Sequence, residues 1–117
     1  MKLYTYAKCG TCRKAVKWLE SRGIEVKEIP IRENPPSKAE LKKMLGVLDG
    51  EIRKLFNTSG QDYRALNLKD TLPGMSEAEA LNLLSGNGNL VKRPFFLTGD
   101  GGAVGFKEEE WRKLLGQ

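Results

Sequence analysis

The chain contains no histidine and only two cysteines, Cys9 and Cys12, among its 117 residues. The absence of histidine excludes imidazole metal ligands, Cys–His nucleophile pairs and Ser–His–Asp triads. A structural zinc site needs four ligands, so two cysteines without histidine do not predict a metal centre. The chemistry of this chain therefore has to come from its thiols and from residues other than histidine.

The sequence also lacks a run of about 18 apolar residues, so no membrane-spanning helix is predicted. Its amino-terminal segment has no apolar stretch of signal-peptide length, and we therefore expect a cytoplasmic protein. The net charge is +5, but basic and acidic residues are interspersed and no block of five or six basic residues occurs. Such dispersed charge is typical of a solvated surface, so we do not expect direct nucleic-acid binding. We also expect a monomer and no membrane partner.

The first thirty residues contain the pattern of a strand, a helix and a second strand. Lys2–Tyr6 alternates apolar and polar residues, and Glu25–Ile31 has similar strand character. Between them, apolar residues at helical spacing end at Gly23, which predicts a helix stop. A strand–helix–strand unit of this length predicts two parallel strands in one sheet.

The middle of the chain, at about residues 33–88, has a helical pattern and is interpreted as an insertion within a single domain, 1–117. Three helix-start signals lie in it: the capping boxes Ser37–Glu40 and Ser76–Glu79, and Asp49 as the cap of a short helix. After it, Phe95–Thr98 and Ala103–Phe106 read as a hairpin, and Lys107–Leu115 as a final amphipathic helix. The order predicts an α/β fold: a thioredoxin-like (glutaredoxin-like) core sheet with an inserted helical subdomain.

The cysteine pair allows three interpretations. A structural disulfide would close a very short loop, for which stabilisation is smallest. Two buried, inert thiols are a second interpretation, because free cysteine is a common core residue. The third is a redox-active dithiol, and it fits the local sequence best. Cys9 follows a strand and precedes a helix, where backbone N–H groups and the positive end of the helix dipole stabilise a thiolate.

The neighbours of the two cysteines support the redox interpretation. Gly10 leaves the helix amides open, and Thr11 can add a hydroxyl donor. Lys8, Arg13 and Lys14 add positive charge nearby. Cys12 lies one helical turn after Cys9, where its thiol can attack a mixed disulfide. We therefore predict Cys9 as the nucleophile and Cys12 as the resolving cysteine.

Four segments together resemble the thioredoxin-fold arsenate reductases and their relatives, which include the Spx-type regulators of RNA polymerase. They are YAKCGTCRKAVKWLESRGIE, ENPPSKAELKKML, NLVKRPFFLT and VGFKEEEW. The resemblance covers essentially the whole chain. It implies that Pro94 is a cis proline opposite the active cysteine and that Arg93 binds an oxyanion. Gly10, Thr11, Arg93 and Pro94 are thus the predicted substrate-binding residues.

The sequence departs from the arsenate reductases at three places. Those enzymes present three arginines to the anion, but one of these positions falls at Asn57 or Thr58 and another near Phe106–Lys107. Arg53 and Arg64 are nearby arginines that could turn inward. The reductases also commonly have serine at the position of Cys12, whereas a second cysteine is similar to the redox switch of Spx-type proteins.

Two functions follow from these features. The first is a thiol–disulfide oxidoreductase related to arsenate reductase. It would need no bound cofactor, and glutathione, glutaredoxin or thioredoxin would restore the dithiol. The second is an Spx-like redox-sensing regulator that binds RNA polymerase, with Gly50 near the position that those proteins use for polymerase contact.

Overall fold

The computed structural model describes all residues from Met1 to Gln117. Its strands are β1 (Lys2–Thr5), β2 (Lys27–Pro30), β3 (Phe95–Leu97) and β4 (Gly102–Val104). Its α-helices are α1 (Gly10–Ser21), α2 (Lys38–Val47), α3 (Gln61–Ala65), α4 (Leu68–Thr71), α5 (Glu77–Gly86) and α6 (Glu108–Leu115). Short 3₁₀ turns are η1 (Ile52–Leu55), η2 (Leu72–Gly74) and η3 (Gly88–Leu90). The fold is α/β, as the sequence predicts.

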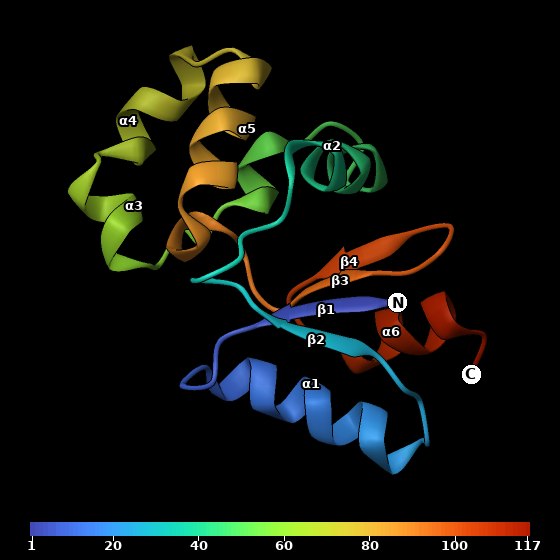
Figure 1. Ribbon diagram of the computed structural model, residues 1–117. Coiled ribbons are helices and arrows are strands. Elements are labelled where there is room, and N and C mark those ends of the chain that lie inside the picture. Colours follow the sequence, from blue (N-terminus) through green and yellow to red (C-terminus); the bar gives the residue numbers. More distant parts are fainter.

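The four strands form one mixed sheet in the order β2-β1-β3-β4 (Figure 1). β1 and β2 are parallel, whereas β3 is antiparallel to both β1 and β4. The carboxyl ends of β1 and β2 and the amino end of β3 therefore meet at the same edge of the sheet. Residues that follow β1 and β2, or precede β3, are brought together there.

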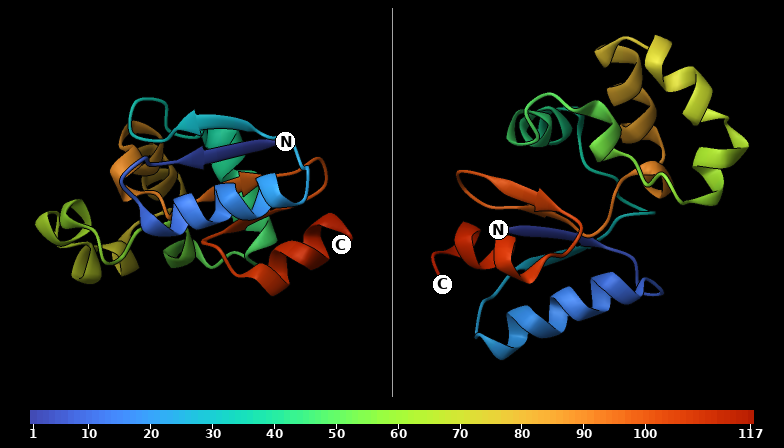
Figure 2. Two further views of the ribbon diagram at one scale, coloured as in Figure 1. Left: turned by 90° about the horizontal axis from the view of Figure 1, so that it is seen from below. Right: turned by 180° about the vertical axis from the view of Figure 1, so that it is seen from behind.

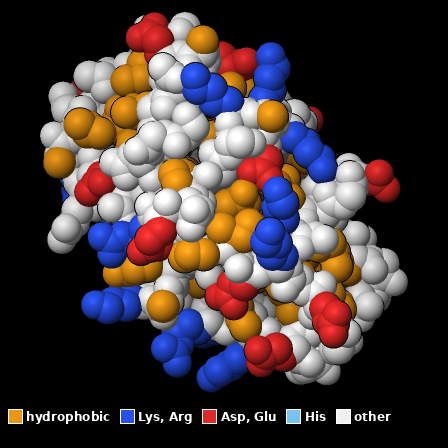
Figure 3. All heavy atoms as spheres, in the orientation of Figure 1, with side chains coloured by type: hydrophobic (Ala, Val, Ile, Leu, Met, Phe, Trp, Pro, Cys, Tyr) orange, Lys and Arg blue, Asp and Glu red, His pale blue; other side chains and the backbone are white.

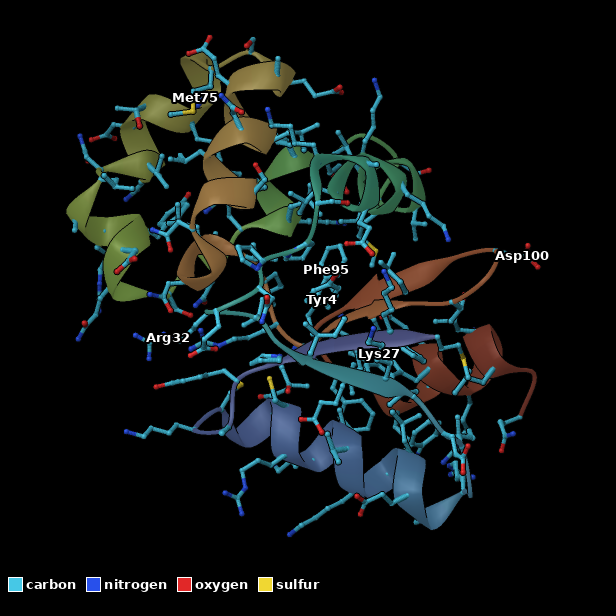
Figure 4. All side chains as sticks on the ribbon, in the orientation of Figure 1. Tyr4, Lys27, Arg32, Met75, Phe95 and Asp100 are labelled. Carbon is cyan, nitrogen blue, oxygen red and sulfur yellow. The ribbon has the colours of Figure 1, made fainter.

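The two faces of the sheet are covered by different helices. α1 and α6 lie on one face, and the helices between β2 and β3 lie on the other, as both views of Figure 2 also show. The alternation of side chains along a strand explains this division. Leu3 and Phe96 point toward α1 and α6, where they pack with Trp111. Tyr4 and Phe95 belong to the larger core beneath the inserted helices (Figure 4).

The helix boundaries follow the local signals closely. Gly23 has a φ of 67° and ends α1, and both predicted capping boxes form at the starts of α2 and α5. One expectation is wrong: Asp49 does not cap the short helix. It lies in the turn after α2 with a φ of 57°, and Glu51 precedes η1 without a side-chain cap. An aspartate tolerates this left-handed conformation because its short polar side chain can bond locally.

A close backbone approach joins the inserted helices to the end of β2. A Cβ atom on Gly88 would lie 1.9 Å from the carbonyl oxygen of Ile31, so only glycine fits there. The segment before β3 is also held by an isolated antiparallel bridge between Phe56 and Val91. Both contacts lie at the sheet edge where β1 and β2 end. None of the helices combines the length and the apolar character needed to cross a membrane.

Candidate active site

Cys9 is the N-cap residue of α1. Its backbone is extended, with φ −91° and ψ 115°, and the N–H of Cys12 donates a hydrogen bond to its Sγ at 3.4 Å. The first N–H groups of a helix have no partner within the helix, and here the cysteine side chain accepts from one of them. The expected placement of Cys9 at a helix start is confirmed.

The two thiols, both free, have opposite environments. Cys9 is half-buried, and this burial opposes its ionisation. Hydrogen bonds from the Cys12 thiol and N–H, together with the Arg93 guanidinium, outweigh burial and hold the pKa of Cys9 below its ordinary value. Cys12 is 1% exposed, and burial raises its pKa to about 12. Of the two reduced thiols, Cys9 is therefore the one that ionises more readily.

The other residues of the cysteine loop have less direct roles. Gly10 begins α1, and a Cβ atom there would meet no atom within 4 Å, so space alone does not require glycine. Thr11 is exposed, and the amide that bonds the Cys9 sulfur is that of Cys12. Substrate binding by Gly10 and Thr11 stays a prediction. Lys8, Arg13 and Lys14 are exposed, and Figure 3 shows basic side chains gathered at this end of the molecule, at its lower left.

Arg93 reaches the cysteine loop from the segment that precedes β3. The Arg93–Pro94 peptide bond is cis, as the family resemblance implies, and Pro94 is buried. The Arg93 Cζ atom lies 4.7 Å from the centre of the Tyr6 ring. This stacking and the effect of the guanidinium on the Cys9 thiol place Arg93 beside the Cys9 sulfur.

The structure adds Arg32 and Tyr6 to the site, neither of which the sequence analysis proposed. Arg32 Nη1 donates a hydrogen bond to the Tyr6 hydroxyl at 2.9 Å, and its Cζ lies 4.9 Å from the ring centre. Figure 4 shows Arg32 at the edge of the sheet, beyond the end of β2. The signal that could have found them is topological, because Tyr6 directly follows β1, Arg32 lies two residues after β2, and these neighbouring strands are parallel.

A polar hollow of about 250 Å³ opens at this edge. Its lining residues are Tyr6, Arg32, Asn57, Gly60, Gln61, Asp62, Asn89 and Arg93. Asn57, at the position aligned with a second family arginine, is held there because its N–H donates to the Leu90 carbonyl at 2.7 Å. Phe106, near the third position, packs on Trp18 and Trp111 instead.

Arg53 and Arg64, the arginines that could have turned inward, line a separate hollow with Tyr63, Asn67 and other residues. They do not join Arg93. The structure brings no three cysteine or carboxylate side chains together in a way that could hold a metal ion. The site consists of a dithiol, a guanidinium beside Cys9, and a polar hollow that contains a second guanidinium.

Comparison with known proteins relates this arrangement to a family. The chain is 53% identical to the uncharacterized protein YusI of Bacillus subtilis, over 94% of this chain and 93% of YusI. It is 32% identical to the global transcriptional regulator Spx of Listeria innocua, over 97% of this chain and 85% of Spx. The crystal structure of an ArsC family related protein from Bacteroides fragilis superimposes with a TM-score of 0.91 at 43% identity, covering 97% and 95% of the two chains.

The match to the family itself spans nearly the whole chain. Residues 4–114 match the ArsC family, and this range contains the dithiol and the cis proline. The Bacteroides fragilis structure shares the thioredoxin-like arrangement of sheet and helices with this chain. The chain is therefore a member of the ArsC family.

Proposed function

We propose that this chain is a cytoplasmic thiol–disulfide oxidoreductase in which Cys9 is the nucleophile and Cys12 the resolving cysteine. The observation that carries the proposal is the asymmetry of the two thiols. Cys9 is accessible and has a lowered pKa, whereas Cys12 is buried and has a raised pKa. A thiolate attacks disulfides and a thiol does not, so this asymmetry supports Cys9 as the residue that attacks first.

The reaction balances in two exchanges and one reduction. The Cys9 thiolate attacks one sulfur of a disulfide RS–SR′, forms Cys9–S–SR and releases R′S⁻. The Cys12 thiolate then attacks the Cys9 sulfur and releases RS⁻, leaving a Cys9–Cys12 disulfide. An external dithiol, or two molecules of a monothiol such as glutathione, supplies the two electrons that restore both thiols.

The high pKa of Cys12 orders these steps. At pH 7, a group with a pKa of about 12 is ionised in about one part in 10⁵. Burial is the largest cause of the raised pKa of Cys12. The hydrogen bond with Cys9 and the charge of Cys9 raise this pKa further. The formation of a mixed disulfide on Cys9 removes that charge. Cys12 thus becomes easier to ionise when Cys9 carries a substrate, which is when its attack is needed.

The substrate of Cys9 can be tested directly by trapping. Without Cys12, a mixed disulfide on Cys9 cannot be resolved, so the variant Cys12→Ser should accumulate one adduct when it is treated with glutathione disulfide. The matched variant Cys9→Ser should accumulate little, because its remaining thiol is buried and protonated. Intact-mass measurement distinguishes the two. An adduct on Cys9→Ser but none on Cys12→Ser would refute the proposal.

Arsenate reduction is a narrower form of the same proposal, because the ArsC family includes arsenate reductases. Arg93 beside Cys9 supports it, since a guanidinium can donate two parallel hydrogen bonds to an oxyanion. The test is arsenate-dependent oxidation of NADPH, coupled through glutathione and glutaredoxin or through thioredoxin. If the protein exchanges with disulfides but oxidises no NADPH in response to arsenate, the thiol–disulfide proposal stands and arsenate reduction is excluded.

A second candidate is a redox-sensing regulator that binds RNA polymerase. The observation that favours it is the 32% identity to Spx over 97% of this chain, together with the second cysteine. Gly50, in the turn after α2, has a φ of 80° and could serve either a contact or the turn itself. Co-purification of RNA polymerase that depends on oxidation of the dithiol would support this candidate, and its absence in both redox states would exclude it.

A further inference from the structure

The polar hollow beside Arg93 has two guanidinium groups without a carboxylate partner. Arg32 and Arg93 both line it, and neither takes part in any of the ion pairs of the structure. Arg32 uses one N–H on the Tyr6 hydroxyl. A guanidinium has five N–H donors, so most of the hydrogen-bonding capacity of Arg32 is free to reach a ligand.

The charge of the hollow sets the kind of anion that it can hold. Its lining contains the two guanidinium groups and one carboxylate, Asp62, whose Oδ2 accepts a hydrogen bond from Asn87 Nδ2 at 3.0 Å. The net formal charge of the lining is therefore +1. This balance matches a carboxylate with a single negative charge better than a multiply charged oxyanion.

Two of the backbone segments that carry amide side chains of the hollow are held together by backbone contacts. Asn57 and Asn89 lie on neighbouring segments, which the Phe56–Val91 bridge joins. The N–H of Asn89 donates to Asn87 Oδ1 at 3.0 Å. These amides, and Gln61, provide neutral donors next to the guanidinium groups, which is the donor set that a carboxylate requires.

We propose that this hollow binds a carboxylate of the thiol compound that becomes disulfide-bonded to Cys9, with Arg32 as a specificity-determining residue. The inference rests on the proposed thiol–disulfide function. Arg93 connects the two parts of the site, because it lies beside the Cys9 sulfur and also lines the hollow. The substrate class is a small cysteine-containing peptide with free carboxylates.

The test compares three disulfides that differ in charge. Reduced protein is oxidised at pH 7 by glutathione disulfide, which carries carboxylates, by neutral bis(2-hydroxyethyl) disulfide, and by cationic cystamine. The remaining free thiol is measured over time in the variants Arg32→Gln and Arg32→Lys. The matched control is Arg64→Gln, which removes the same charge from an exposed arginine in the other hollow.

Arg32→Gln should lower the rate with glutathione disulfide about 10-fold, equivalent to about 1.4 kcal/mol. It should change the rate with the neutral disulfide less than about twofold and raise the rate with cystamine, because a repelling charge is gone. Arg32→Lys should restore part of the rate with glutathione disulfide, and Arg64→Gln should change no rate more than about twofold.

Two results would overturn the inference while the proposed function stands. One is an equal loss with the carboxylate-bearing and the neutral disulfide in Arg32→Gln, which would indicate a structural role. The other is the same charge dependence in Arg64→Gln, which would indicate a general field of the molecule. If the unaltered protein reacts with none of the three disulfides through Cys9, the proposed function itself fails.

Discussion

Replacement of Arg93 by glutamine should weaken the acidity of Cys9 and leave its sulfur in place. Arg93 acts on the Cys9 thiolate through both a hydrogen bond and its charge, and both effects lower the pKa of Cys9. A cation at such short range typically changes the ionisation constant of a neighbouring acid by about tenfold or more. The bonds from Cys12 remain in the variant, so we expect the lower end of that range.

The rate of alkylation should change less than the acidity, and its sign should depend on pH. A more basic thiolate is a better nucleophile, with a Brønsted exponent of about 0.4–0.5. A tenfold loss of thiolate is therefore offset by about a threefold gain in the reactivity of the thiolate that remains. At a pH below the pKa of Cys9 in both proteins, Arg93→Gln should therefore react about threefold more slowly than the unaltered protein. At a pH above the pKa of Cys9 in both proteins, the variant should react about threefold faster, because its thiolate is more basic.

The assay is the alkylation of Cys9 by iodoacetamide, followed by peptide mass spectrometry from pH 5 to pH 10. This reagent is neutral, so the loss of the arginine charge does not change its local concentration. Arg64→Gln is the control and should follow the unaltered profile. Profiles for Arg93→Gln that superimpose on the unaltered ones, or that are lower by one factor at every pH, would refute the assigned role of Arg93.

Two further predictions concern the attachment of the inserted helices to the sheet. The Tyr4 hydroxyl donates a hydrogen bond to Glu40 Oε1 at 2.6 Å. Partial burial raises the pKa of Glu40, but this bond and other donors outweigh burial and hold the pKa below its ordinary value. The stabilisation is therefore complete above the ordinary glutamate pKa and is lost as the pH falls through the folded-state value. Glu40→Gln should reduce the free energy of unfolding by about 1 kcal/mol at pH 7, and urea titrations should show this difference shrinking below about pH 4. Gly88→Ala should destabilise by about 2 kcal/mol or more in thermal unfolding, because its methyl group would lie 1.9 Å from a backbone carbonyl oxygen. The matched Gly86→Ala, with no atom within 4 Å of its Cβ, should be neutral or stabilising, and equal losses would contradict this reasoning.

Local signals in the sequence were sufficient for most of the secondary structure. Both capping boxes and the Gly23 stop act through neighbours within a few residues, and the structure contains all three. The α/β class and the thioredoxin-like sheet followed from the order of these elements. Asp49 was the exception, because an aspartate after a helix serves a left-handed turn as readily as a cap.

The site was only partly accessible from the sequence. The position of Cys9 at a helix start is a local property, and it was predicted from the residues on either side. The pairing of Arg93 with Cys9 came from the family resemblance, since no local pattern links residues so far apart. The predicted parallel pairing of the first two strands could have pointed to Arg32, but the close approach of Gly88 to Ile31 is not visible in a single sequence.

The central claim is that Cys9, and not Cys12, is the reactive thiol of the reduced protein. Its most direct test is labelling of the unaltered chain at pH 7 with iodoacetamide at less than one equivalent, followed by peptide mass spectrometry. The account predicts that nearly all of the label lies on Cys9, because Cys12 is buried and its pKa is about 12. Label found mainly on Cys12, or divided equally between the two cysteines, would contradict it.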